Sequence, residues 1–110
     1  MLSVYKLWHR ILEDFPKKSK YSLGSKIDLL FIEVLEAMYT ASYLSKKEKI
    51  PFLQRAINKL DTLKFFLQVA WEVDSLDETK FMSLFEPLYN IGQLLGGWRN
   101  KMIKENSPTK

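Results

Sequence analysis

Apolar residues recur along most of the chain at spacings of three and four, which is the pattern of amphipathic helices. Four helices are predicted, and no segment shows the alternation typical of a strand. The first ends before Pro16, because a residue that precedes proline is pushed out of the helical region. The other three are expected over residues 23–45, 49–74 and 77–104. The sequence therefore predicts an all-α protein, an up-down-up-down four-helix bundle.

Residues with known positional preferences indicate where these helices begin and end. Ser22 is the candidate N-cap of the second helix, and Ser45 lies where that helix is expected to close. Pro51 suits the first turn of the third helix. Ser75 or Asp77 supplies the capping signal of the fourth helix.

The length of 110 residues favours a single domain. We expect that domain to cover residues 1–105 and the polar tail at 106–110 to be disordered.

The second predicted helix carries more apolar surface than one core contact needs. A surface helix usually shows a single apolar stripe a little over 100° wide. Here a second row accompanies the first, and it consists of Leu29, Ile32, Leu35, Tyr39 and Tyr43. We expect part of this row to meet another subunit, so the sequence predicts a homo-oligomer.

The fourth predicted helix has the most regular pattern, with spacings that alternate three and four as in the seam of a bundle. The seam consists of Phe81, Leu84, Leu88, Ile91, Leu95, Trp98 and Met102. It passes through Gly92, Gly96 and Gly97, although each glycine inside a helix costs about 1 kcal/mol relative to alanine. We favour a continuous helix in which the glycines let another backbone come close and Trp98 keeps the packing register. The alternative is that Gly96 or Gly97 ends the helix.

Few residues are candidates for catalysis or for binding a metal or cofactor. The chain has no cysteine and one histidine, His9, so a metal site would have to rely on carboxylates. Glu33 and Glu36 share a helix face but lack the Glu-x-x-His companion of a bundle di-metal site. The segment "GQLLGG" lacks the lysine and hydroxyl residue of a phosphate loop. We therefore predict no catalytic residue, no metal and no cofactor, which means that the protein is not an enzyme.

The N-terminal segment lacks the charged start and small-residue cleavage site of a signal peptide. No apolar run approaches the ~18 residues that a membrane span needs. We expect a soluble, cytoplasmic protein that makes no membrane contact.

The net charge of +4 and the isoelectric point near 9.3 favour an anionic partner. Basic residues cluster in three places: Lys17, Lys18 and Lys20; Lys46, Lys47 and Lys49; and Arg99, Lys101 and Lys104. The first and second connections lie at opposite ends of an up-down bundle, so the three clusters cannot all form one patch on a monomer. Our first candidate for nucleic-acid contact is the group Lys17, Lys18 and Lys20. The second is Arg55, Lys59 and Lys64 on the third helix, and Arg99 is a further candidate.

Three segments carry a resemblance to a known family: "FPKKSKYSLGSKI" at residues 15–27, the leucine-rich "LDTLKFFLQVA", and the late "IGQLLGGW". Together they make the chain, over roughly residues 4–103, similar to the accessory variability determinants (Avd) of diversity-generating retroelements. Family members often carry glutamate and arginine around the isoleucine-glycine pair and an arginine late in the third helix. This sequence has Asn90, Gln93 and Gln68 there.

The resemblance implies a four-helix bundle that assembles into a ring-like homopentamer. It also implies a protein that binds RNA or DNA and acts as partner of a reverse transcriptase, which copies template RNA with errors at adenines. Two other interpretations stay open. One is a four-helix-bundle protein of the type encoded in ribosomal-RNA intervening sequences. The other is an oligomeric scaffold without a nucleic-acid role.

Overall fold

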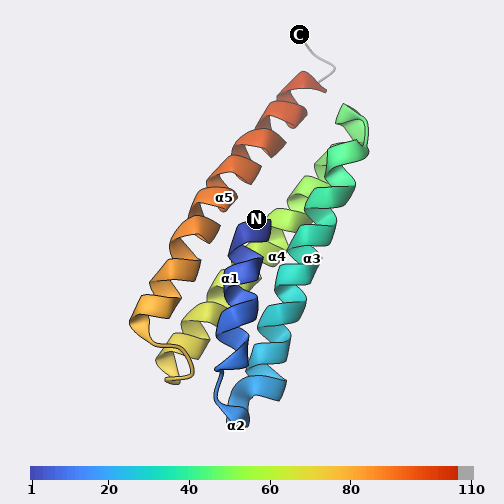
Figure 1. Cartoon of the computed structure of the whole chain (residues 1–110). Coiled ribbons are helices and arrows are strands. Elements are labelled where there is room, and N and C mark those ends of the chain that lie inside the picture. Colours follow the sequence, from blue (N-terminus) through green and yellow to red (C-terminus); the bar gives the residue numbers. More distant parts are fainter. Residues whose placement is uncertain (107–110) are drawn as a thin grey trace.

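The computed structural model describes residues 1–106, and every regular element in that range is helical (Figure 1). Four principal helices follow one another along the chain. They are α1 (Leu2–Glu13), α3 (Ser25–Tyr43), α4 (Lys46–Glu72) and α5 (Glu78–Glu105). A short helix, α2 (Lys17–Ser19), and a π-helical turn, η1 (Lys20–Gly24), join α1 to α3.

The helices pack in chain order around one core. α4 lies against both α3 and α5, while α1 lies against α3 and α5 from the other side. The molecule measures 54 × 20 × 20 Å. With 12 residues against 28 in α5, α1 covers only part of the bundle, and its N-terminus lies midway along the molecule (Figure 1). The prediction of an all-α four-helix bundle is confirmed.

The apolar periodicity explains which side chains are buried. Most of the seam of α5 is in the core, namely Phe81, Leu84, Leu88, Leu95 and Met102, while Ile91 and Trp98 are half-buried. The apolar spacing did not predict Ala56, which is fully buried in α4 next to a half-buried Ile57.

The connection between α1 and α3 differs from the prediction. Ser22 is not an N-cap, because the chain is already helical before it; its hydroxyl donates to the carbonyl oxygen of Ser19 (3.4 Å). Two residues later, Gly24 is buried against α1. A Cβ atom there would lie 3.0 Å from Leu12 Cδ1 and 3.4 Å from Phe15 Cδ2. The glycine that permits close packing inside this chain is therefore Gly24.

The caps of α4 and α5 correct one prediction and confirm another. Ser45 begins α4 and does not close α3: its hydroxyl accepts from the Glu48 backbone N–H, and the Glu48 carboxylate accepts in return from Ser45. α4 thus starts before the predicted residue 49, and Pro51 lies inside it, beyond the first turn. Asp77 caps α5 by accepting from the Lys80 N–H (2.8 Å), as the sequence indicated.

The C-terminal helix is continuous through its glycines, so the prediction of an unbroken helix is confirmed and the early C-cap is wrong. It ends at Asn106, whose side-chain amide donates to the carbonyl oxygens of Met102 (2.8 Å) and Lys46 (3.3 Å). Asn106, which was assigned to the disordered tail, thus ties the end of α5 to the start of α4. The rest of that tail, 107–110, lies outside the described residues.

Candidate nucleic-acid interface

The basic clusters of the sequence lie at the two ends of the bundle. We call one the loop end, formed by residues 13–20 and 72–80, where the α1–α3 connection meets the α4–α5 turn. We call the other the cationic end, formed by residues 44–49 and 99–106, where the α3–α4 turn meets the last turns of α5. The two ends lie at opposite extremes of the long axis (Figure 1).

At the loop end, the lysines of our first candidate group share the end with a larger number of acidic side chains. Lys17 and Lys18 are exposed and Lys20 is half-buried. A hydrogen bond between the Ser19 and Ser75 hydroxyls (2.7 Å) holds this segment beside the α4–α5 turn. That turn is acidic, and the loop end as a whole has four basic and six acidic side chains. The lysine cluster therefore lies in a region of net negative formal charge.

The cationic end has the opposite balance, with six basic and two acidic side chains. Its formal excess of four positive charges equals the net charge of the whole chain. An ion pair between Lys46 and Glu105 (3.2 Å) joins the start of α4 to the end of α5. The second and third basic clusters of the sequence therefore come together at one end. The order of the connections alone did not predict that the second one meets the end of the C-terminal helix.

Lys49 and Trp98 connect the three helices of the cationic end. The Lys49 ammonium donates to the carbonyl oxygen of Ala41, near the end of α3, and lies 5.6 Å from the centroid of the Trp98 ring on α5. A cation near a helix C-terminus and over an aromatic face is stabilised by both. The predicted packing residue Trp98 is thus half-buried beneath a lysine, and Lys49 is held inside the end and away from its outer surface.

Arg99 lies beside an open hollow formed by the glycines of α5. Its guanidinium donates to Gln54 Oε1 on α4 (3.0 Å) and to Asn100 Oδ1 (3.2 Å). The hollow is lined by Ile57, Gly92, Gln93, Gly96, Gly97, Arg99 and Asn100. A Cβ atom on Gly92 would make ordinary contact with Leu60 (3.5 Å), while one on Gly96 or Gly97 would meet no atom within 4 Å. Inside one chain, no backbone approaches Gly96 or Gly97 closely.

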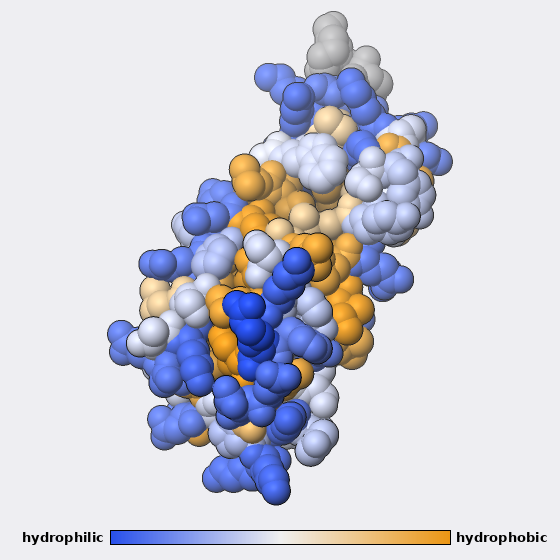
Figure 2. All heavy atoms as spheres, in the orientation of Figure 1, coloured by the Kyte–Doolittle hydropathy of each residue, from blue (hydrophilic) through white to orange (hydrophobic). Residues whose placement is uncertain are grey.

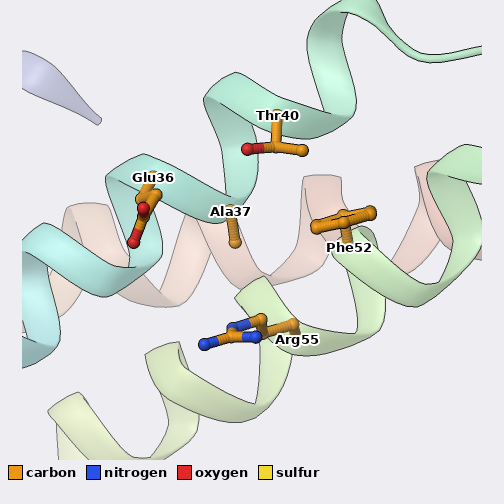
Figure 3. Close-up of a pocket in the computed structure, with 5 residues that line it drawn as sticks. All are labelled: Glu36, Ala37, Thr40, Phe52 and Arg55. Carbon is orange, nitrogen blue, oxygen red and sulfur yellow. The ribbon is translucent and has the colours of Figure 1, made fainter.

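The second candidate group does not form one surface. Lys59 pairs with Glu33 of α3 (3.4 Å), whereas Lys64 pairs with Asp61 (3.5 Å) and lies 5.5 Å from the Tyr89 ring of α5. Arg55 lines a hollow of about 120 Å³ between α3 and α4, opposite Glu36 and Thr40 (Figure 3). Arg55 and Lys59 therefore face α3, while Lys64 faces α5.

Apolar surface remains exposed on α3. The row that the sequence assigned to a subunit contact includes Leu29 and Ile32, each nearly half exposed, and Tyr39 and Tyr43, which are 70% and 64% exposed. The two tyrosine rings pack edge to face with centroids 5.4 Å apart. On the face seen in Figure 2, apolar surface runs along the middle of the molecule between more hydrophilic ends.

Titratable groups give little indication of chemistry in the part of the chain that the structure describes. No group of three or more histidine, cysteine, aspartate and glutamate side chains there could hold a metal ion. His9 is exposed on α1, next to Tyr5. Over residues 1–106, none of the helices has both the length and the apolar character that crossing a membrane requires.

The fold and its charges define a class: a small four-helix bundle with a formal excess of positive charge at one end. The chain belongs to the bAvd-like family, whose model matches residues 2–102. These are the bacterial Avd accessory proteins of diversity-generating retroelements, so the resemblance found in the sequence is confirmed. Family membership implies an accessory role in such a retroelement, and proteins of this family are generally non-catalytic. Comparison with curated proteins and with solved structures yields no significant match.

Proposed function

We propose that this protein is a non-enzymatic accessory factor that binds a retroelement reverse transcriptase together with RNA or DNA in the cytoplasm. In this role it supports mutagenic cDNA synthesis from template RNA. The observation that carries the proposal is the family match over residues 2–102. The excess positive charge of the cationic end adds to it, because phosphate backbones bind through such charge.

We further propose that the protein works as a homo-oligomer, and the family resemblance favours a pentamer. The exposed Leu29 and Ile32 of the apolar row on α3 support a subunit contact, since monomeric proteins rarely leave a contiguous apolar patch open to water. An assembly would also repeat each cationic end, so that weak single contacts add through multivalency.

Co-expression with a reverse transcriptase of a diversity-generating retroelement tests the proposed partner. We expect the two proteins to copurify, and cDNA synthesis from template RNA to require both. Light scattering of the purified accessory protein should show five subunits of 13.0 kDa, or about 65 kDa. An oligomer that neither copurifies with the enzyme nor changes cDNA synthesis would favour the scaffold interpretation, and a 13.0 kDa particle would exclude the oligomer.

A further inference from the structure

We infer that the cationic end is a binding surface for single-stranded nucleic acid. Phosphates lie on Lys47, Lys101 and Lys104, and unpaired bases stack on Tyr39 and Tyr43. The inference rests on the proposed function, because it takes nucleic acid to be a partner, and it moves the contact from the loop end to the opposite end of the bundle.

The two ends of the bundle carry formal charges of opposite sign. The loop end has more acidic than basic side chains, so a phosphate chain approaching Lys17, Lys18 and Lys20 also meets the carboxylates of the α4–α5 turn. At the cationic end only Glu48 and Glu105 oppose six basic groups, and Glu105 is already paired with Lys46. Summed charge of one sign in a small region attracts a polyanion over about the Debye length of 10 Å. The cationic end is therefore where the attraction is strongest.

The basic groups of the cationic end differ in whether contacts within the chain already hold them. Lys49 is held by Ala41 and Trp98, and Arg99 by Gln54. Lys47, Lys101 and Lys104 are exposed, and no ion pair joins them to another of the described side chains. These three ammonium groups can move to phosphate oxygens without breaking a contact within the chain.

The tyrosine pair indicates what kind of anion the end accepts. Tyr39 and Tyr43 lie in the last turns of α3, directly before the turn that carries Lys47. Exposed aromatic rings beside a basic surface are the common means of holding unpaired bases, whereas the bases of a duplex are already stacked on one another. An acidic protein would satisfy the lysines but would not require two exposed aromatic faces. The combination favours a single strand.

Fluorescence anisotropy with a labelled oligo(U) strand tests the location. The test variant replaces Lys47, Lys101 and Lys104 by glutamine, and the matched control replaces Lys17, Lys18 and Lys20 by glutamine. Both remove three positive charges from exposed or half-buried positions at one end. We expect the test variant to bind on the order of tenfold or more weakly, with a salt dependence flatter by about two units of slope. The control should bind nearly as the unmodified protein does.

A second pair of variants tests the stacking. Tyr39→Ser with Tyr43→Ser should weaken oligo(U) binding at least about fivefold. Tyr21→Ser, which replaces a still more exposed tyrosine of η1, should not. Light scattering must show that the tyrosine variant keeps the oligomeric state of the unmodified protein. A changed state would assign these rings to a subunit contact and overturn the stacking. Equal binding of oligo(U) and an RNA duplex would overturn the preference for a single strand.

The remaining outcomes separate this inference from the proposed function. If the loop-end variant loses binding and the cationic-end variant does not, the inference is wrong while the nucleic-acid role stands. If the unmodified protein binds no oligonucleotide at low salt, both are wrong. If it binds none and the cationic-end variant also loses capture of the reverse transcriptase, the end is a protein-docking surface.

Discussion

The two ends of the bundle differ in how their polar groups are satisfied. At the loop end, α1 covers the core, Gly24 packs under Leu12 and Phe15, and the Ser19 and Ser75 hydroxyls join two connections. At the cationic end α1 does not reach, and the α5 glycines border an open hollow. One end thus packs α1 and a glycine against the core, while the other carries an excess of positive charge beside an open hollow.

This difference indicates where function is located in a small bundle. An excess of charge of one sign destabilises a compact state through self-repulsion. The excess of positive charge at the cationic end therefore costs stability in the isolated chain. A partner that neutralises this charge removes that cost. The loop end has no such excess of positive charge, and its hydroxyls and its helix cap bond within the chain.

The largest expected effect compares one tryptophan from each half of the bundle. Trp8 has no exposed surface, stacks on Phe31 (5.7 Å between centroids) and donates to Asp28 Oδ1 (3.1 Å). Trp8→Ala should lower the free energy of unfolding by about 3–5 kcal/mol. Trp98→Ala should cost less, on the order of 1 kcal/mol, because Trp98 is half-buried and contacts Lys49.

Urea unfolding followed by circular dichroism measures both variants. Equal losses of unfolding free energy in the two variants would contradict the expected difference. They would mean that the cationic end is as tightly packed as the half covered by α1. A loss at Trp98 that grows with protein concentration would instead reveal that this end is covered in the oligomer.

The second prediction uses one substitution at two glycines. Gly24→Leu should cost about 1–3 kcal/mol, because even a Cβ there lies 3.0 Å from Leu12 Cδ1. Gly96→Leu should be neutral or should stabilise the chain by up to about 1 kcal/mol, because the added side chain meets open space and leucine favours a helix. Thermal unfolding compares the two. Should Gly96→Leu cost as much as Gly24→Leu, another subunit packs in the hollow and the predicted close approach is right.

The sequence predicted the helices well where apolar spacing alone determines the structure. The register of α5 through Leu88 and Leu95 was correct because buried positions repeat with the helical period whatever surrounds them. Ser45 was assigned to the wrong helix, although the Glu48 three residues later completes a capping box. That local signal was present in the sequence and was missed.

The candidate site was harder to predict because it depends on which connections meet in space. The lysines at 17–20 form a conspicuous cluster in the sequence, but the Ser19–Ser75 contact that places them beside acidic residues joins positions far apart in the chain. The pairing of Lys46 with Glu105 is equally distant. Apolar periodicity predicts which residues face the core. It does not predict which charged segments, far apart in the sequence, lie together at one end of the bundle.

The smallest expected effect concerns the polar contact between α1 and α3. The Tyr5 hydroxyl donates to Asp28 Oδ1 (2.9 Å), which also accepts from Trp8. Burial raises the pKa of Tyr5 above its ordinary value of 10.0, and the hydrogen bond to the Asp28 carboxylate and its negative charge raise it further. The folded chain therefore holds this proton more tightly than the unfolded chain does.

It follows that the stabilisation from Tyr5 is complete below about pH 10 and is lost as the pH rises through the higher folded-state pKa. Tyr5→Phe should cost about 0.5–1.5 kcal/mol at neutral pH, because it removes the hydrogen bond. The difference between the unmodified protein and the variant should then shrink above about pH 10, because the phenylalanine variant has no proton to lose at this position. Urea unfolding from pH 7 to 11 measures both curves, with Tyr21→Phe as the control for loss of an exposed hydroxyl. Curves for Tyr5→Phe and the unmodified protein that stay parallel would show that the contact with Asp28 does not hold α1 on the bundle in solution. The half of the bundle that α1 covers would then lose one of the contacts that set it apart.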